Sequence, residues 1–119
     1  MVTAQDVRRL ASTLPRTEEA LVRDSVKFRV RSLVYVAITP DEQLMGFAFP
    51  KEERAALVLS RPDTFLMPVL SDERYNWVRV RLAAIDASEM RELVVDAWRM
   101  VVPKGVAAAY DREHGSDRR

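Results

Sequence analysis

Basic side chains recur at every second position in two segments of the sequence. In the first segment Lys27, Arg29 and Arg31 alternate with Phe28 and Val30. The second segment reads Trp77, Val78, Arg79, Val80, Arg81 and Leu82. Because successive side chains of a strand point to opposite faces, both segments are predicted to be strands with one polar and one apolar face. If helices cover the apolar faces, five cations and one indole share the open face of a sheet.

Such a face has the chemistry needed to bind nucleic acid. Cations can contact phosphates, and the indole of Trp77 offers a surface on which a base can stack. The hypothesis assigns binding to Lys27, Arg29, Arg31, Trp77, Arg79 and Arg81. The alternative is an ordinary polar strand surface, with arginines paired to neighbours such as Asp24 or Glu73 and with Trp77 packed against Tyr75.

The sequence offers little to catalysis or to metal binding. It has no cysteine and one histidine, His114, close to the C-terminus. A charged tail there could gather Asp111, Glu113, His114 and Asp117 into a weak metal site, but solvated charge explains the pattern better. The three glycines stand alone, so no glycine-rich phosphate loop is present. We therefore predict a protein that is not an enzyme, with no catalytic residue, no metal and no cofactor.

Composition points to one small domain. The chain has 119 residues, of which 48% are hydrophobic and 31% charged, and its net charge is +1. This length predicts a single domain over residues 1–111, followed by a charged tail over residues 112–119. Nucleic-acid-binding domains are usually more basic, so any such binding is expected to be weak and non-specific. Without an apolar leader or a membrane-length apolar run, we expect a cytoplasmic protein with no membrane contact.

Hydrophobic periodicity predicts the elements that carry these residues. Thr3 and Asp6 can cap a first helix that ends at Pro15, and Asp86 and Glu89 open a later helix with an apolar stripe from Met90 to Val101. Residues 16–24 are predicted to be a polar connection. Strands are predicted at Lys27–Arg31, Leu33–Thr39, Leu44–Phe49, Thr64–Val69 and Trp77–Leu82, and further helices at Pro50–Ser60 and Val106–Tyr110. The fold class is therefore α+β, in α-β(3)-α-β(2)-α order, with an antiparallel sheet and helices packed on one face.

The whole chain resembles the MmcQ/YjbR family. The resemblance rests on Phe28-Arg29-Val30, Trp77-Val78, Asp96-Ala97-Trp98-Arg99, Pro103-Lys104 and Ala108-Ala109-Tyr110-Asp111, in this order and spacing. It implies an α+β fold likened to that of secretion chaperones, and a family label of DNA-binding. Many relatives carry a lysine where Ala48 stands and a proline where Val26 stands, so an anion site at the centre of this sheet would be weaker here.

Three classes of function follow from these observations. The first is a non-enzymatic protein that binds nucleic acid, DNA above all, through its basic open face. The second is a module that binds a protein partner or forms a homodimer, because an exposed sheet edge can pair with another chain. The third is a small-ligand-binding domain with a cleft between sheet and helices.

Overall fold

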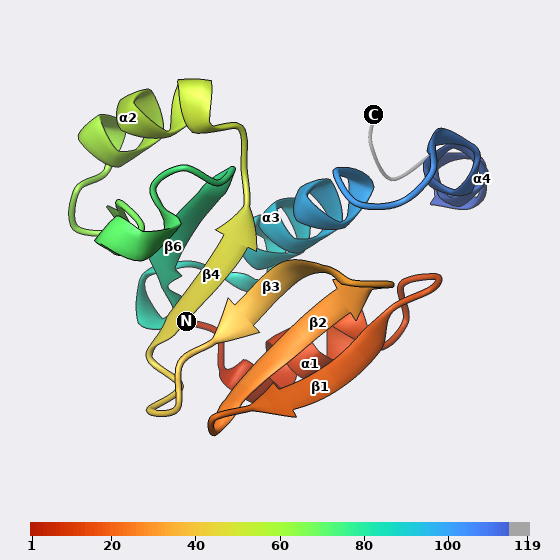
Figure 1. The fold of residues 1–119 in the computed structure, drawn as a ribbon, viewed down its shortest axis with the longest axis horizontal. Coiled ribbons are helices and arrows are strands. Elements are labelled where there is room, and N and C mark those ends of the chain that lie inside the picture. Colours follow the sequence, from red (N-terminus) through yellow and green to blue (C-terminus); the bar gives the residue numbers. More distant parts are fainter. Residues whose placement is uncertain (115–119) are drawn as a thin grey trace.

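The structure is a computed structural model that describes residues 1–114, and it folds into one layer of strands with helices against it (Figure 1). In chain order the elements are α1 (Ala4–Ala11), β1 (Glu18–Val22), β2 (Ser25–Val30), β3 (Leu33–Ile38), β4 (Leu44–Ala48), α2 (Lys51–Ser60), β5 (Phe65–Leu66), β6 (Trp77–Arg81), α3 (Ala87–Arg99) and α4 (Lys104–His114). None of these helices is long and apolar enough to cross a bilayer.

All strand pairs of the sheet are antiparallel, in the order β1-β2-β3-β4-β6-β5. The predicted α+β class and antiparallel sheet are thus confirmed. Strands β1 to β4 form a meander in which each strand pairs with the next one along the chain. The chain then passes through α2 and β5 before β6 returns to pair with β4, so β6 lies between β4 and β5.

The prediction of a polar connection over residues 16–24 is wrong, because β1 forms there and pairs with β2. A two-residue turn, Arg23 and Asp24, joins the two strands. Both residues have positive φ, 51° and 66°, the pattern of a type I′ turn. Such turns usually contain glycine or asparagine, and because neither stands here the residue types did not indicate a hairpin.

The apolar face of the sheet is the face that the alternation predicted. Phe28, Val30, Val78 and Val80 are buried, and α1 and α3 lie behind the sheet in Figure 1. Helix α3 packs on β3 and β4. Its Trp98 is fully buried and donates a hydrogen bond from Nε1 to the carbonyl of Pro15 at 2.9 Å, which fixes the end of the first helical segment against α3.

The predicted caps form as the sequence indicates. Thr3 and Asp6 make a reciprocal capping box at α1, and the Asp86 carboxylate accepts a hydrogen bond from the backbone N–H of Glu89 at α3. Helix α1 ends at Ala11, a turn before Pro15. The predicted edge strand over residues 64–69 is reduced to β5, which lies at the sheet edge beside β6.

Helix α4 is longer than the short helix predicted over residues 106–110. Its last turn includes Arg112, Glu113 and His114, which the sequence analysis assigned to the tail. Asp117, the remaining residue of the suggested tail metal site, lies outside the described residues. Tyr110 of α4 packs against Trp98 with ring centroids 5.0 Å apart, so α4 extends the core beyond α3.

Candidate nucleic-acid interface

The open face of the sheet has small residues at its centre and basic residues on either side. One cross-strand row runs from Lys27 on β2 through Ala37 on β3 and Gly46 on β4 to Arg79 on β6. Directly opposed residues of antiparallel strands project from the same face. With strands about 4.8 Å apart, the backbones beneath Lys27 and Arg79 are separated by about 14 Å. The row therefore places one cation at each end of a flat stretch of small residues, Ala37 and Gly46, which we call the floor of the open face.

Trp77 covers part of this floor. A Cβ atom added to Gly46 would lie only 2.6 Å from Nε1 of the indole, so the ring rests directly on the glycine. Trp77 itself pairs with Ala48 and is half-buried. Its position therefore depends on two small neighbours on β4, Gly46 and Ala48. One side of the ring rests on the sheet while the residue stays partly accessible to solvent.

Arg54 of α2 anchors the segment of chain that leads into β6 and Trp77. It was not among the residues predicted from the sequence. Arg54 is only 9% exposed. Its Nη2 donates to the carbonyl of Glu73 at 2.5 Å, and its Nη1 donates to the carbonyls of Tyr75 and Trp77 at 2.9 and 3.4 Å. A buried cation with this many backbone acceptors holds the entry to β6 in one conformation.

Two of the predicted cations already have partners. Nε of Arg29 lies 3.5 Å from a carboxylate oxygen of Glu18, and the two side chains are 44% and 64% exposed. Arg79 donates from Nε and Nη2 to the carbonyl of Met67 at 3.0 and 2.8 Å. Neither Asp24 nor Glu73 provides the pairing that the sequence alternative named, so the acidic partner on this face is Glu18.

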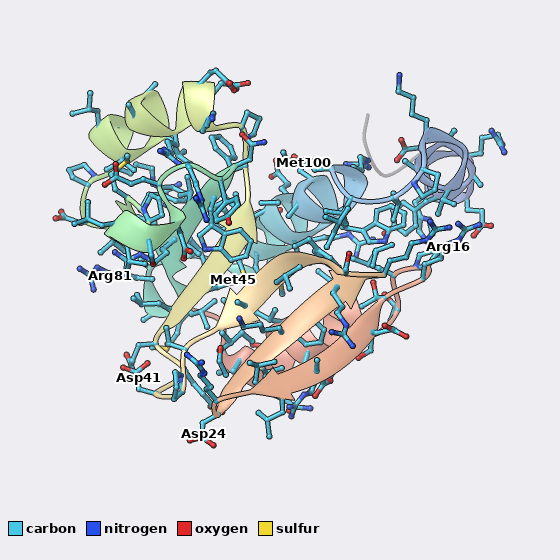
Figure 2. All side chains as sticks on the ribbon, viewed as in Figure 1. Arg16, Asp24, Asp41, Met45, Arg81 and Met100 are labelled. Atoms are coloured by element: carbon cyan, nitrogen blue, oxygen red, sulfur yellow. The ribbon has the colours of Figure 1, made fainter. Side chains whose placement is uncertain are left out.

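Lys27 and Arg81 differ from the two paired cations. Within residues 1–114, neither side chain makes an ion pair or a side-chain hydrogen bond. Arg81 is exposed, and Figure 2 shows it projecting from the molecular surface. Lys27 is half-buried beside Ala37. These two residues are available to an external anion without loss of an existing contact.

Arg31 does not belong to the face. Strand β2 ends at Val30, and Arg31 is the first residue of the turn between β2 and β3, with φ of 57°. The period-two alternation therefore stops one residue earlier than the sequence pattern suggested. The sheet order also separates the remaining cations, because β3 and β4 lie between β2 and β6. The structure brings Trp77, Arg79 and Arg81 together, and sets Lys27 and Arg29 apart from them.

The residues with catalytic potential are engaged elsewhere. His114 stacks on Tyr110 with ring centroids 4.1 Å apart, and Asp111 accepts a hydrogen bond from Arg99 at 2.6 Å. Residues 1–114 contain no group of three or more histidine or acidic side chains placed to hold a metal ion.

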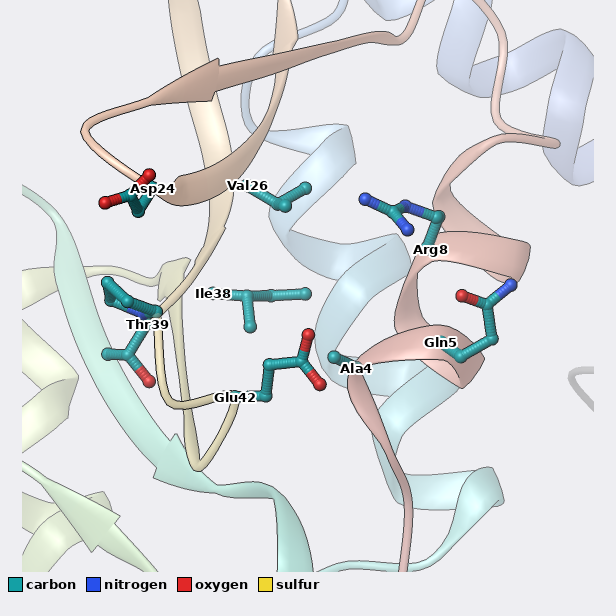
Figure 3. A pocket seen from close by; sticks show the side chains of 9 residues that line it. Ala4, Gln5, Arg8, Asp24, Val26, Ile38, Thr39 and Glu42 are labelled. Carbon is teal, nitrogen blue, oxygen red and sulfur yellow. The ribbon is translucent and has the colours of Figure 1, made fainter.

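A small pocket lies between α1 and the strand ends on the helix-covered side (Figure 3). Arg8, Asp24 and Glu42 supply its charged wall, and Val26 and Ile38 supply its apolar wall. Its volume is about 90 Å³. Pockets that enclose a small-molecule ligand are usually about 300–1,000 Å³, so this one suits only water or a very small group.

Comparison with known proteins places the chain in a family. The family model described as YjbR matches residues 12–100, which is most of the described fold. The chain belongs to the YjbR family. This confirms the resemblance drawn from the sequence, and it means that the sheet, α2 and α3 are features of a family domain. No curated protein matches the sequence.

The fold itself has a solved counterpart. The crystal structure of the Deinococcus radiodurans protein DR2400, which carries a DUF419 domain, superimposes with a TM-score of 0.75 and 22% sequence identity. The match covers 97% of this chain and 89% of that one. At this level of identity the similarity shows a shared fold, with α4 and the N-terminal helix included in the aligned length.

Proposed function

We propose that this YjbR-family protein is a non-enzymatic binding protein, and that its open sheet face binds single-stranded nucleic acid weakly and without sequence preference. The observation that supports the proposal best is the row from Lys27 through Ala37 and Gly46 to Arg79, with the indole of Trp77 on its floor. Cations at the sides and an aromatic ring on the floor are the two elements that sequence-tolerant single-strand binding requires.

The existing partners of the cations leave room for phosphate. Arg79 uses two of its N–H donors on Met67, and a guanidinium has five, so it can hold Met67 and a phosphate together. The exposed pair of Arg29 with Glu18 is worth about 0–1 kcal/mol, so a phosphate can displace it. Lys27 and Arg81 need no rearrangement.

A single strand suits this face better than a duplex. Its unpaired bases can turn towards Trp77 while the phosphates reach the cations, whereas a duplex keeps its bases stacked internally and would use the cations alone. With a net charge of +1, long-range attraction is small. We therefore expect affinity in the range of non-specific complexes, with Kd of about 1–100 μM at physiological salt.

Fluorescence anisotropy with labelled single-stranded and duplex oligonucleotides tests the proposal. If about three phosphates are contacted, log affinity for a single strand should fall against log salt with a slope near −2. Trp77→Ala should weaken single-strand binding by about 1–3 kcal/mol and leave duplex binding nearly unchanged. The double variant Lys27→Ala/Arg81→Ala should weaken binding to both.

A matched control removes the same charge from other surfaces. Arg9→Ala/Arg112→Ala also deletes two positive charges, but from exposed positions on α1 and α4. Its affinity should stay within about twofold of the parent, because screening over roughly a Debye length of 10 Å limits distant charges. The proposal fails if no binding occurs at about 50 mM salt, or if both double variants lose affinity equally.

A further inference from the structure

The two edges of the sheet are protected to different degrees. At one edge β5 has only two residues, Pro68 follows shortly after it, and the Met67 carbonyl is already bonded to Arg79. Short strands and prolines prevent an edge from pairing with another chain. At the other edge β1 is a full five-residue strand with no proline and no lysine. Figure 1 shows β1 as the outermost strand on its side, with no element beyond it.

The β1 edge also exposes apolar side chains. Leu21 is 70% exposed and Val22 is 41% exposed. Leu21 pairs with Val26, which continues the row through Ile38, Met45 and Val80 on the helix-covered face. An apolar row of the core therefore continues to an uncovered leucine at the edge of the sheet.

The backbone of this edge is ready to pair. In a two-residue hairpin the residues that flank the turn, Val22 and Ser25, form a hydrogen-bonded pair, and such pairs alternate along the strands. The N–H and C=O groups of Ala20 and Val22 therefore point towards β2. Those of Glu19 and Leu21 point outward, away from the sheet.

We propose that β1 pairs antiparallel with β1 of a second copy of this chain, about a two-fold axis at Leu21. This register brings the outward backbone groups of Leu21 opposite those of its counterpart, and the two leucine side chains contact each other. Val22 then lies opposite Ala20, and Glu19 of one copy lies beside the turn residue Arg23 of the other. The interface thus has apolar contact at its centre, and at each end the attraction between Glu19 and Arg23 is opposed by Glu18, which lies beside Asp24.

Other antiparallel registers are less favourable. An axis at Glu19 sets two glutamates directly opposite each other, which is destabilising. An axis at Ala20 sets Glu19 against Leu21 and Glu18 against Val22, so carboxylates would face apolar side chains. Only the axis at Leu21 sets the apolar residues Ala20, Leu21 and Val22 opposite one another. Because one strand pair buries a modest area, the dimer is of the weak, reversible class.

Analytical ultracentrifugation of the full chain tests the proposal. The average mass should rise from 13.6 kDa towards twice that value as concentration increases from about 10 μM to about 1 mM, the range of weak association. Leu21→Lys should hold the protein at monomer mass, because an edge lysine opposes pairing. Leu59→Lys is the matched control, since Leu59 is 80% exposed on α2, and it should associate like the parent.

A second measurement tests the register. The chain has no cysteine, so each single-cysteine variant reports one position. Leu21→Cys should cross-link between copies with a short bifunctional thiol reagent, because its Cα atoms would lie about 5.5 Å apart. Glu19→Cys should not, because its two copies would be four residues apart along the ladder, about 13 Å. A monomer throughout the concentration range, association that survives Leu21→Lys, or preferential cross-linking through position 19 would overturn the proposal.

Discussion

Replacing Arg54 should destabilise the fold by removing the charged contacts that anchor the entry to β6. Arg54→Met keeps most of the side-chain volume but leaves the carbonyls of Glu73 and Tyr75 without their donor. A hydrogen bond to a charged group contributes about 1.5–3 kcal/mol. Loss of the two shorter hydrogen bonds should therefore lower the free energy of unfolding by about 3–6 kcal/mol. The third bond, at 3.4 Å, adds little.

Water reduces this figure. Glu73 and Tyr75 are exposed residues, so their carbonyls can gain solvent partners when the guanidinium is removed. We expect a net loss near the lower bound, about 3 kcal/mol, a large share of the roughly 5–15 kcal/mol that stabilises a domain. With a urea dependence of about 2 kcal/mol per M, the unfolding midpoint should fall by about 1.5 M.

Urea unfolding, followed by far-ultraviolet circular dichroism, measures the effect. Arg81→Met is the matched control, because the Arg81 side chain has no partner within residues 1–114. Its free energy of unfolding should change by less than about 0.5 kcal/mol. The urea midpoint of Arg54→Lys should lie between those of Arg54→Met and Arg81→Met, since an ammonium group cannot reproduce the planar guanidinium and its several donors. Equal midpoints for Arg54→Met and Arg81→Met would refute the anchoring role.

Three further predictions concern the core and the open face. Trp98→Ala should cost about 3–5 kcal/mol and lower the melting temperature by roughly 10 °C or more; a change of under about 3 °C would show that the ring is not part of the core. Gly46→Ala should push the indole of Trp77 off the sheet, so that acrylamide quenches more of the tryptophan emission, while unchanged quenching would contradict the contact. Burial raises the pKa of Tyr35 to about 12, outweighing the opposing hydrogen bond with Thr17. The stability that this phenol contributes should therefore be complete below pH 10 and be lost as pH rises towards 12. Unfolding measured across this pH range should show the loss, and Tyr35→Phe should remove it. Titration followed by ultraviolet absorbance should show the ionisation of Tyr35 directly.

The sequence predicted best where one face of a strand is buried. Phe28 and Val30 alternate with cations because β2 has covered neighbours and an exposed outer face, and the same holds for Val78 and Val80 in β6. Period-two burial leaves a readable trace in residue types. The caps of α1 and α3 were equally readable, since the side chain that caps is local in sequence.

Strand β1 was missed because an edge strand buries too little to need alternation. Four of its five residues are exposed, including Leu21 and Val22. Its turn, Arg23 and Asp24, adopts a left-handed conformation without glycine, which removes the usual signal for a hairpin. What remained was a polar segment bounded by charges, typical of a loop.

The candidate site could be predicted only in part for a related reason. Alternation determines which face a residue occupies but carries no information on which strands are neighbours. The insertion of β3 and β4 between β2 and β6 separates the cations, and nothing local to either strand indicates it. Gly46 and Arg54 were missed because their roles depend on contacts with Trp77 and the chain before it, distant in sequence.

The position of β6 between β4 and β5 has a consequence for synthesis of the chain. Strands β1 to β4 pair with immediate neighbours, so this meander can form as soon as it leaves the ribosome. Strand β5 follows in the chain but has no partner until β6 is made, and β4 keeps one open edge over the same interval. For about thirty residues of translation the nascent chain therefore presents Met45 and Phe47 beside an unpaired backbone, a short period in which chaperone binding or misassociation competes with folding.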